Sequence, residues 1–323
     1  MKVLLADPAI ARFQHHLGDL TGLEVVRVPV ADRRFPEELA NAEVFVGAQL
    51  PVSASASFEG LRFVQVPGAG VDGIPAEALA SGTVVANVFE HEHSIAEYII
   101  MAMLAMSRDL VNSDRDLREG VWRNPAFDET LPFPLTLRGR HLLLVGFGHI
   151  GQAVARFAQA FSMRVSAVRR TPERGAGGIE GVAVAGVDQL GGLLEDADFV
   201  VVVTPLTNET RGLIGEGELA RMKPGAGLIN VARGPVVDET ALFEALASRR
   251  LAHAALDVWY RPPSRESGAQ PAAHPFHSLD NVLMTPHYSG VTEETFRNRA
   301  TLIGENLRRF RDGKPLENVV FVT

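Results

Sequence analysis

The chain has 323 residues, of which 46% are hydrophobic and 22% charged, as in an ordinary globular protein of about two domains. Its 31 basic and 39 acidic residues give a net charge of −8, which disfavours general binding to nucleic acid or to an anionic membrane. The absence of cysteine excludes disulfides, thiolate nucleophiles and cysteine-ligated metals. No apolar stretch is long enough for a signal peptide or a membrane span, so we expect a cytoplasmic protein.

Two series of short apolar strands alternate with helical segments, which is typical of βαβ units with a parallel sheet. The first series is predicted at Val3–Ala6, Val25–Val28, Val44–Gly47 and Phe63–Val66, with helices or turns at Pro36–Ala42 and Pro75–Ser81. The second series is predicted at His141–Val145, Arg164–Val168, Phe199–Val203, Gly227–Asn230 and His253–Asp257.

A long and mostly apolar helix, Ser94–Asn112, is predicted between the two series. Ser94 followed by Glu97 has the spacing of a capping box, in which the serine hydroxyl satisfies an N–H group at the helix start. Because the helix is apolar on most faces, we expect it to be buried between domains or subunits.

The end of the chain contains a long loop and a final helix. Residues Arg261–Ser278 include four prolines and are expected to form the loop, and the last helix is expected over Glu293–Arg311. The segment after this helix is too short for a domain and is expected to pack back on the first one. The sequence therefore predicts a domain of residues 1–93 and 288–323, with a second domain, residues 94–287, inserted into it.

The sharpest local signal is the G-x-G-x-x-G spacing of Gly146, Gly148 and Gly151, which follows an apolar strand and opens a helix. In this context the first glycine permits a tight turn, the second lets the backbone approach a pyrophosphate, and the third allows close packing of helix on strand. The helix N-terminus supplies N–H donors and a positive dipole for the phosphates. The alternative is a tight turn without a ligand.

The next strand ends in Arg169, Arg170 and Thr171, where an NAD site would place a carboxylate to accept a hydrogen bond from the ribose 2′-hydroxyl. A carboxylate would repel a 2′-phosphate, whereas two guanidinium groups and a hydroxyl would bind one. This predicts NADP as the cofactor, with NAD as the second choice. A solvated arginine pair is the alternative interpretation.

Further segments occur in order around the glycine motif: VPGAGVDGIP (66–75), TPLTNETRGLI (204–214), NVARGPVVDETALFEAL (230–246), ALDVW (255–259) and TPHYSG (285–290). Together they resemble the D-isomer-specific 2-hydroxyacid dehydrogenases over nearly the whole chain, most of all the glyoxylate and hydroxypyruvate reductases, with some segments similar to formate dehydrogenases. This resemblance implies an α/β fold with two Rossmann-like domains, a flavodoxin-like substrate domain and an inserted NAD(P)-binding Rossmann domain. It also implies an active-site cleft between the domains and a homodimer.

The resemblance further implies hydride transfer between the nicotinamide and C2 of a small 2-oxo or 2-hydroxy acid. Arg233 would clamp the 2-oxo group and the carboxylate, a task that suits the fixed donor fork of a guanidinium. His287 would move the proton on the C2 oxygen as general acid–base. The backbone amides of Ala69 and Gly70 would receive the substrate carboxylate, and Asp257 would hold the nicotinamide carboxamide. The full cofactor-binding set that the resemblance implies is Gly146, Phe147, Gly148, His149, Ile150, Gly151, Arg169, Arg170, Thr171, Thr204, Pro205, Thr210, Val231, Ala232, Arg233, Asp257, His287 and Gly290.

The chain departs from the family pattern at Pro262, where the family places a glutamate that raises the pKa of the catalytic histidine. Glu266 could fold back into that role. Without such a partner, we expect a lowered pKa of His287 and a reduction rate that falls off at lower pH than is usual in the family.

A second departure is His91, which stands where the family carries an asparagine facing the cleft. His91 or His93 is expected either to contact the substrate or to cap a helix. Their spacing could also belong to a metal site, but two histidines and one carboxylate are too few, and no metal is expected.

Two classes of function remain open. The first is an NADP-preferring reductase of small 2-oxo acids, supported by Arg233 and His287. The second is a cofactor-dependent binding or regulatory protein with weakened turnover, which Pro262 favours. Formate oxidation is a third hypothesis. It is disfavoured because His91 stands where an asparagine is expected and because Arg169 argues against NAD.

Overall fold

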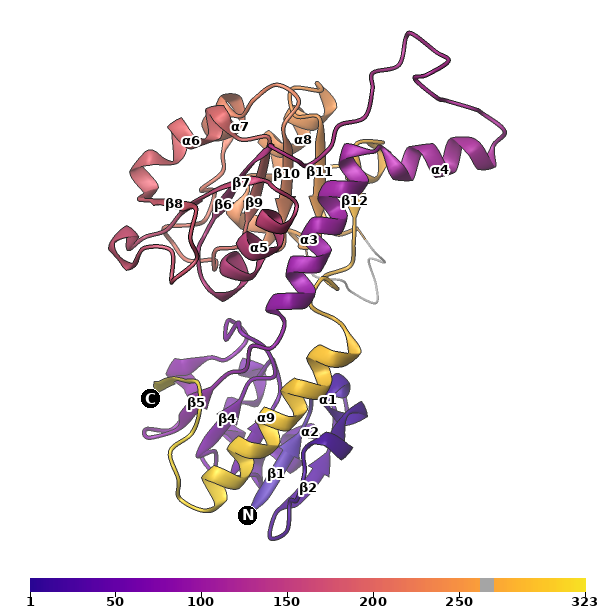
Figure 1. The fold of residues 1–323 in the computed structure, drawn as a ribbon. Helices are drawn as coiled ribbons and strands as arrows, with labels where there is room; N and C mark the ends of the chain where they lie inside the picture. The colour runs from indigo at the N-terminus through magenta and orange to yellow at the C-terminus, as the bar shows by residue number, and fades with distance from the viewer. Residues whose placement is uncertain (262–269) are drawn as a thin grey trace. The chain divides into compact units, whose positions relative to one another are not determined.

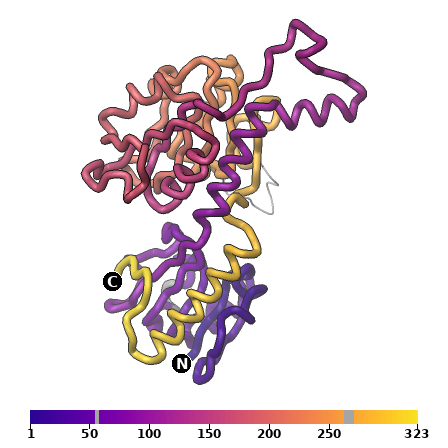
Figure 2. Tube along the Cα trace, viewed as in Figure 1, coloured from indigo at the N-terminus to yellow at the C-terminus, as the bar shows by residue number. Residues whose placement is uncertain are grey.

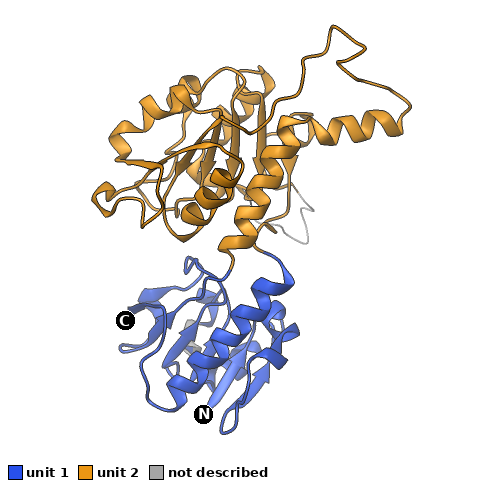
Figure 3. Ribbon diagram, viewed as in Figure 1, with its two compact units in different colours: residues 1–90, 291–323 blue, residues 91–290 orange. Residues whose placement is uncertain are grey.

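The computed structural model describes residues 1–261 and 270–323, except the side chains of residues 55–57, so Pro262 and Glu266 lie outside the described residues. The chain forms two compact units, shown in Figure 3. Unit 1 comprises Met1–Glu90 and Val291–Thr323, and unit 2 comprises His91–Gly290. Both ends of the chain (Figure 2) belong to unit 1, and unit 2 lies between its two segments in the sequence.

A six-stranded sheet with the order β13-β5-β4-β3-β1-β2 forms the centre of unit 1. Its parallel strands are β1 (Lys2–Leu5), β2 (Glu24–Arg27), β3 (Val44–Val46), β4 (Phe63–Gln65) and β5 (Val84–Ala86). Their order, 2-1-3-4-5, is that of flavodoxin-like folds. The last strand, β13 (Val319–Val322), pairs antiparallel with β5, which confirms that the end of the chain packs back on the first domain.

Helices cover both faces of this sheet because successive strand residues point to opposite sides. Val3 and Leu5 pack with Ile303 and Leu307 of α9, whereas Leu4 packs on the other face. Figure 1 shows α9 lying across the sheet. The helices of unit 1 are α1 (Pro8–Arg12), α2 (Phe35–Ala40) and α9 (Glu293–Arg311), with 3-10 turns at Gln14–His16, Val52–Ser57 and Ala76–Ala78.

Unit 2 contains a seven-stranded parallel sheet with the order β12-β11-β10-β9-β6-β7-β8, the arrangement of a Rossmann fold. Its strands are β6 (His141–Val145), β7 (Arg164–Val168), β8 (Val182–Ala185), β9 (Phe199–Val202), β10 (Gly227–Asn230), β11 (His253–Leu256) and β12 (Val282–Met284). The α/β class and both predicted sheet types are confirmed.

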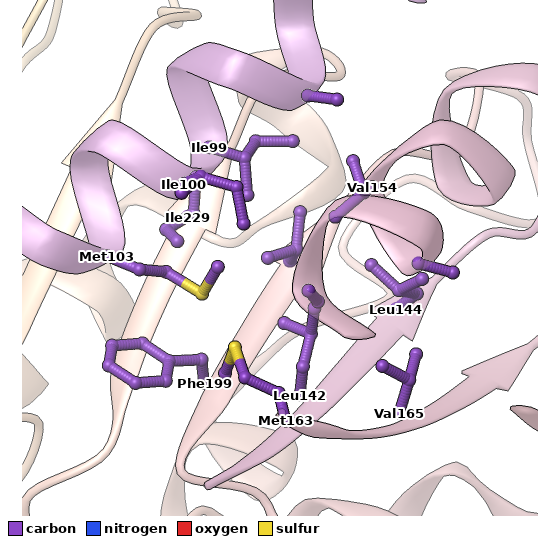
Figure 4. Close-up of a cluster of buried hydrophobic side chains, with 14 of the residues drawn as sticks. Ile99, Ile100, Met103, Leu142, Leu144, Val154, Met163, Val165, Phe199 and Ile229 are labelled. Atoms are coloured by element: carbon purple, nitrogen blue, oxygen red, sulfur yellow. The ribbon is translucent and has the colours of Figure 1, made fainter. Parts of the chain in front are cut away.

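The core of unit 2 lies on both faces of this sheet. On one face α3 and α5 pack over Leu142, Leu144 and Phe199, as Figure 4 shows. On the other face α6, α7 and α8 cover Leu143 and Val200. The helices of unit 2 are α3 (Glu92–Ser107), α4 (Leu110–Arg118), α5 (His149–Ala160), α6 (Leu190–Asp196), α7 (Glu216–Arg221) and α8 (Glu239–Ala247), with 3-10 turns at Pro172–Arg174, Val187–Gln189, Gly234–Val236 and Phe276–Ser278.

The prediction of one capped helix over Ser94–Asn112 is wrong in two respects. The helix α3 begins at Glu92, and the hydroxyl of Ser94 donates to the carbonyl oxygen of Ser289 at 2.7 Å instead of capping. The helix ends at Ser107, because Asp109 adopts a left-handed backbone with φ of 47° and separates α3 from α4.

Residues 110–135, which we call the arm, extend from the sheet of unit 2 (Figure 1). The arm leaves after Ser107 and returns at Leu135, whose N–H donates to the carbonyl oxygen of Ser107 at 3.2 Å. Among the described residues, no helix has the length and apolar character needed to cross a membrane.

Candidate active site

The predicted functional residues of unit 2 follow the carboxyl ends of its strands. Gly146 comes after β6, Arg169 after β7, Thr204 after β9 and Arg233 after β10, and Asp257 directly follows β11. In a parallel sheet these ends share one edge, and ligands bind there where the strand order reverses. The order reverses beside β6, which pairs with both β7 and β9.

The glycine loop has the geometry that its sequence predicts. Gly146 has φ of 110°, and a Cβ there would lie 2.8 Å from the carbonyl oxygen of Val203. A Cβ on Gly151 would lie 2.7 Å from the carbonyl oxygen of Gly146, so both positions need glycine for packing alone. Gly148, at the N-cap of α5, differs because a Cβ there would meet no atom within 4 Å. Open space above a helix N-terminus suits a pyrophosphate.

The two arginines after β7 are used differently. Arg169 is half-buried, and its Nη1 donates to the carbonyl oxygen of Gly175 at 3.2 Å, which ties it to the following loop. The side chains of Arg170 and Thr171 are exposed. One guanidinium group therefore supports the loop, while the other lies at the surface beside a hydroxyl.

The turn after β9 is closed by a hydroxyl. The side chain of Thr210 donates to the carbonyl oxygen of Pro205 at 2.7 Å and accepts from the N–H of Thr207 at 2.7 Å. Thr210 therefore shapes this turn, which begins at Thr204.

Arg233 is presented by a loop that Asn230 closes. The Asn230 amide donates to the carbonyl oxygen of Arg233 at 3.1 Å and accepts from the N–H of Ala232 at 3.0 Å. The guanidinium Nη1 of Arg233 donates to the carbonyl oxygen of Ala232 at 2.7 Å. This role of Asn230, the last residue of β10, was not predicted, although an asparagine at the end of a strand is a signal for such a turn.

Asp257 has no exposed surface, and its carboxylate accepts three hydrogen bonds from the loop after β12. Its Oδ1 accepts from the hydroxyl of Thr285 at 2.7 Å and from the N–H of Tyr288 at 2.9 Å. Its Oδ2 accepts from the N–H of Ser289 at 2.9 Å. All three of these hydrogen bonds come from the loop that contains His287, which offsets the cost of burying the carboxylate.

His287 occupies the centre of this loop with φ of 57°, a left-handed backbone that is uncommon for a residue other than glycine. Its side chain is exposed at the surface of unit 2, yet the protein around it removes enough water to lower the pKa of the imidazole. The charge of Asp257 raises this pKa and that of Arg233 lowers it. The net pKa lies below the ordinary histidine value of 6.5.

The N-terminus of α3 contains the other predicted histidines. His91 is 8% exposed and occupies the N-cap position, but its side chain makes no capping hydrogen bond, so the capping interpretation is wrong. A Cβ on Gly290 would lie 3.3 Å from the Cβ of His91. The ring of His93 packs against Phe157 with 5.9 Å between centroids. In the described part of the chain, no three His, Asp or Glu side chains are arranged to hold a metal ion.

The remaining predicted residues lie on the same loops or in unit 1. Ala69 and Gly70 follow β4 of unit 1, where the side-chain amide of Asn87 donates to the carbonyl oxygen of Ala69 at 2.7 Å. His149 lies 3.8 Å from the carboxylate of Glu92, measured from its Nδ1. Phe147, Ile150, Val231, Ala232 and Gly290 belong to the loops and helix start at the carboxyl edge of unit 2.

The family profile described as "D-isomer specific 2-hydroxyacid dehydrogenase, NAD binding domain" matches residues 100–289, which is more than half of the chain. The chain belongs to this family. The match includes the glycine loop, Arg233, Asp257 and His287, so these residues lie within the NAD-binding domain of the family.

Curated relatives agree with this assignment. The D-3-phosphoglycerate dehydrogenases of Methanocaldococcus jannaschii and Archaeoglobus fulgidus are 32% and 34% identical over 99% of this chain, which spans 59% of their length. The glyoxylate reductase of Korarchaeum cryptofilum is 37% identical over 80% of this chain and 76% of its own.

Solved structures of 2-hydroxyacid dehydrogenases are similar over the whole chain. A family protein from Aeromonas salmonicida has a TM-score of 0.83 at 27% identity, covering 99% of this chain and 98% of that one. A D-isomer specific 2-hydroxyacid dehydrogenase from Xanthobacter autotrophicus Py2, in complex with NADPH and MES, has a TM-score of 0.79 at 31% identity, with the same coverage.

Proposed function

We propose that this chain is an NADP-preferring oxidoreductase that transfers a hydride between nicotinamide and C2 of a small 2-oxo or 2-hydroxy acid, acting mainly as a reductase. The observation that carries the proposal is the order of groups at one sheet edge. Arg233, Asp257 and His287 follow β10, β11 and β12, which are neighbouring parallel strands. Unit 2 then serves as the cofactor domain and unit 1 as the substrate domain.

The residues divide the chemistry between them. The guanidinium fork of Arg233 binds the carboxylate and the 2-oxo group and favours the negative charge that develops on that oxygen. The imidazole of His287 donates a proton to the oxygen during reduction and accepts it back during oxidation. The amides of Ala69 and Gly70 receive the substrate carboxylate, and His91 adds a polar contact. A bound nicotinamide dinucleotide supplies the hydride.

Asp257 has one acceptor position left for the predicted contact with the cofactor. A carboxylate has about four acceptor positions, and the loop after β12 uses three of them. The predicted contact with the nicotinamide carboxamide can use only the remaining position on Oδ2, and it stays a prediction.

NADP is proposed over NAD because Arg170 and Thr171 are exposed after β7, where an NAD site would place a carboxylate. The Xanthobacter relative, which is named as a complex with NADPH, supports the same choice.

A homodimer is proposed from the arm. Its apolar side chains Trp122, Phe127 and Phe133 are 73%, 84% and 72% exposed, and an apolar surface of this extent marks a site of protein association. A second copy of the chain is the occupant we propose, because the family resemblance implies a homodimer. The helix α3 that leads into the arm also exposes Met101 and Leu104, which would extend the apolar surface.

The proposal is tested by following oxidation of NADPH and NADH with a panel of 2-oxo acids that includes glyoxylate and hydroxypyruvate, across about pH 5 to 8. Turnover with NADPH that is lost in Arg233→Ala and kept in Arg164→Ala supports it. Arg164 is the matched control because it begins β7 and therefore lies at the amino-terminal ends of the strands, away from the proposed site. Tight NADPH binding without turnover on any acid would replace the reductase with a binding or regulatory protein.

A further inference from the structure

Tyr98 of α3 contacts the His287 loop at two points. Its hydroxyl lies 2.7 Å from the Oγ1 of Thr285, and its ring packs edge to face against Tyr288 with 6.0 Å between centroids and 81° between planes. Thr285 and Tyr288 stand on either side of His287 in the sequence. One side chain therefore holds the loop before and after its histidine.

The hydrogen bonds of this contact have a defined direction. Thr285 has one hydroxyl proton, which it donates to Asp257 at 2.7 Å, so the hydroxyl of Tyr98 must be the donor to Thr285. Burial raises the pKa of Tyr98 above its ordinary value, and the phenol therefore keeps its proton. The result is a chain of donors from Tyr98 through Thr285 to the Asp257 carboxylate, in which each bond polarises the next.

This series of hydrogen bonds ends on the Asp257 carboxylate, which fixes the backbone of His287. The left-handed φ of His287 is disfavoured for a residue with a Cβ and persists only where the surroundings hold it. What holds it is the Asp257 carboxylate, through the N–H groups of Tyr288 and Ser289. Within the part of the chain that the structure describes, the charged groups that act on the imidazole are Asp257 from the end of β11 and Arg233 from the loop after β10.

We propose that Tyr98 is a positioning residue, which acts through Thr285 and Asp257 to hold the His287 imidazole in place for proton transfer. The inference rests on the proposed reductase function. A phenylalanine at position 98 would fill the same space and pack on Tyr288, but it would not donate. The hydroxyl is therefore the atom to test.

A double-mutant cycle tests the route of this effect. Tyr98→Phe is expected to lower kcat about threefold to tenfold, as for loss of one hydrogen bond, with the KM for NADPH unchanged. Thr285→Val is expected to lower kcat further, because Asp257 then loses a donor directly. Tyr98→Phe added to Thr285→Val is expected to be neutral or to restore activity, since the phenol has already lost its acceptor. If the two losses of kcat multiply in the double variant, the proposal is overturned, because Tyr98 then acts independently of Thr285.

Two control variants separate this role from simple packing. Thr285→Ser keeps the hydroxyl and should retain most of the activity. Tyr260→Phe alters a half-buried tyrosine whose ring stacks on Phe276, and it should have no effect. If Tyr260→Phe lowered kcat as much as Tyr98→Phe does, the positioning role of Tyr98 would be contradicted.

A readout without turnover distinguishes failure of this inference from failure of the proposed function. In NMR titrations of the imidazole protons, Tyr98→Phe should change the resonances and the pKa of His287, because the Asp257 carboxylate, whose charge raises that pKa, loses part of its hydrogen-bond support. An unchanged resonance and pKa would overturn the positioning role even if no 2-oxo acid were reduced. Lack of turnover by the unaltered protein, with the NMR shift present, would count against the reductase alone.

Discussion

Gly234 and Trp259 approach so closely that a Cβ on Gly234 would lie 2.3 Å from the carbonyl oxygen of Trp259. The indole of Trp259 in turn donates to the carbonyl oxygen of Thr285 at 2.8 Å. The loops after β10, β11 and β12 are therefore joined by direct contacts. Arg233 and His287, which these loops present, depend on one packed backbone arrangement.

Gly234→Ala is the first prediction from this packing. The added methyl group must displace one of the two loops, which we expect to cost about 1–3 kcal/mol in stability, as for overpacking, and to lower kcat/KM more than tenfold. Thermal unfolding and steady-state kinetics measure both effects. Gly217→Ala is the matched control, because a Cβ there meets no atom within 4 Å and alanine favours the helix α7. Full activity of Gly234→Ala would show that the loops tolerate separation.

The lowered pKa of His287 predicts the pH dependence of both reaction directions. Reduction needs the protonated imidazole, so kcat/KM should be constant at low pH and fall as the pH rises through the pKa of His287. Because desolvation and Arg233 lower that pKa, the midpoint is expected below 6.5. Oxidation needs the neutral imidazole and should rise through the same pKa. A reduction limb centred above about pH 7.5 would contradict the assignment.

Gly148→Ala separates ligand binding from packing in the glycine loop. Since a Cβ at this position meets no protein atom, the unliganded protein should unfold at nearly the same temperature. If the space belongs to a pyrophosphate, NADPH affinity should fall at least about tenfold, and the thermal stabilisation by NADPH should shrink accordingly. Gly151→Ala should instead destabilise the unliganded protein, because its Cβ would lie 2.7 Å from the carbonyl oxygen of Gly146. Unchanged NADPH affinity in Gly148→Ala would place the phosphates elsewhere.

The order of the elements could be predicted from the sequence because continuous apolar runs mark buried parallel strands. The buried strands β6, β7 and β10 were predicted with the observed bounds. The strands that were missed, β5, β8, β12 and β13, are apolar runs of three or four residues as well, and all but β5 are mostly half-buried or exposed. Runs this short did not separate strands from apolar loop segments in the sequence.

The site was predictable where a motif carries its own chemistry, as in the glycine loop, Arg233 and His287. The contacts that hold these groups could not be predicted, because they join residues that are far apart in the sequence. Tyr98 and Thr285 are 187 residues apart, and no local spacing relates them. The prediction of a capping box at Ser94 was wrong for the same reason, since the serine hydroxyl donates a hydrogen bond to Ser289, which is distant in the sequence.

The two arginines after β7 should respond differently to substitution. Arg170→Ala is expected to weaken NADPH binding about tenfold or more, as for loss of a charge-assisted hydrogen bond, and to leave NADH binding unchanged. Arg169→Ala should weaken both cofactors, because this side chain also ties down the loop at Gly175. Fluorescence titration with each cofactor measures the two affinities. Equal losses for NADPH and NADH in Arg170→Ala would remove the basis for an NADP preference.

The arm predicts the oligomeric state. Trp122 and Phe127 are 73% and 84% exposed in the single chain, and burying two such aromatic side chains contributes several kcal/mol to association. The double variant Trp122→Glu/Phe127→Glu is expected to convert a dimer into a monomer, since two carboxylates would have to lose water at the interface. Sedimentation velocity measures the mass directly. Val52→Glu is the matched control, because Val52 is an exposed apolar residue of unit 1, outside the arm, and its variant should remain dimeric. A monomeric unaltered protein, or a double variant that keeps the dimer mass, would show that the arm does not form a dimer interface.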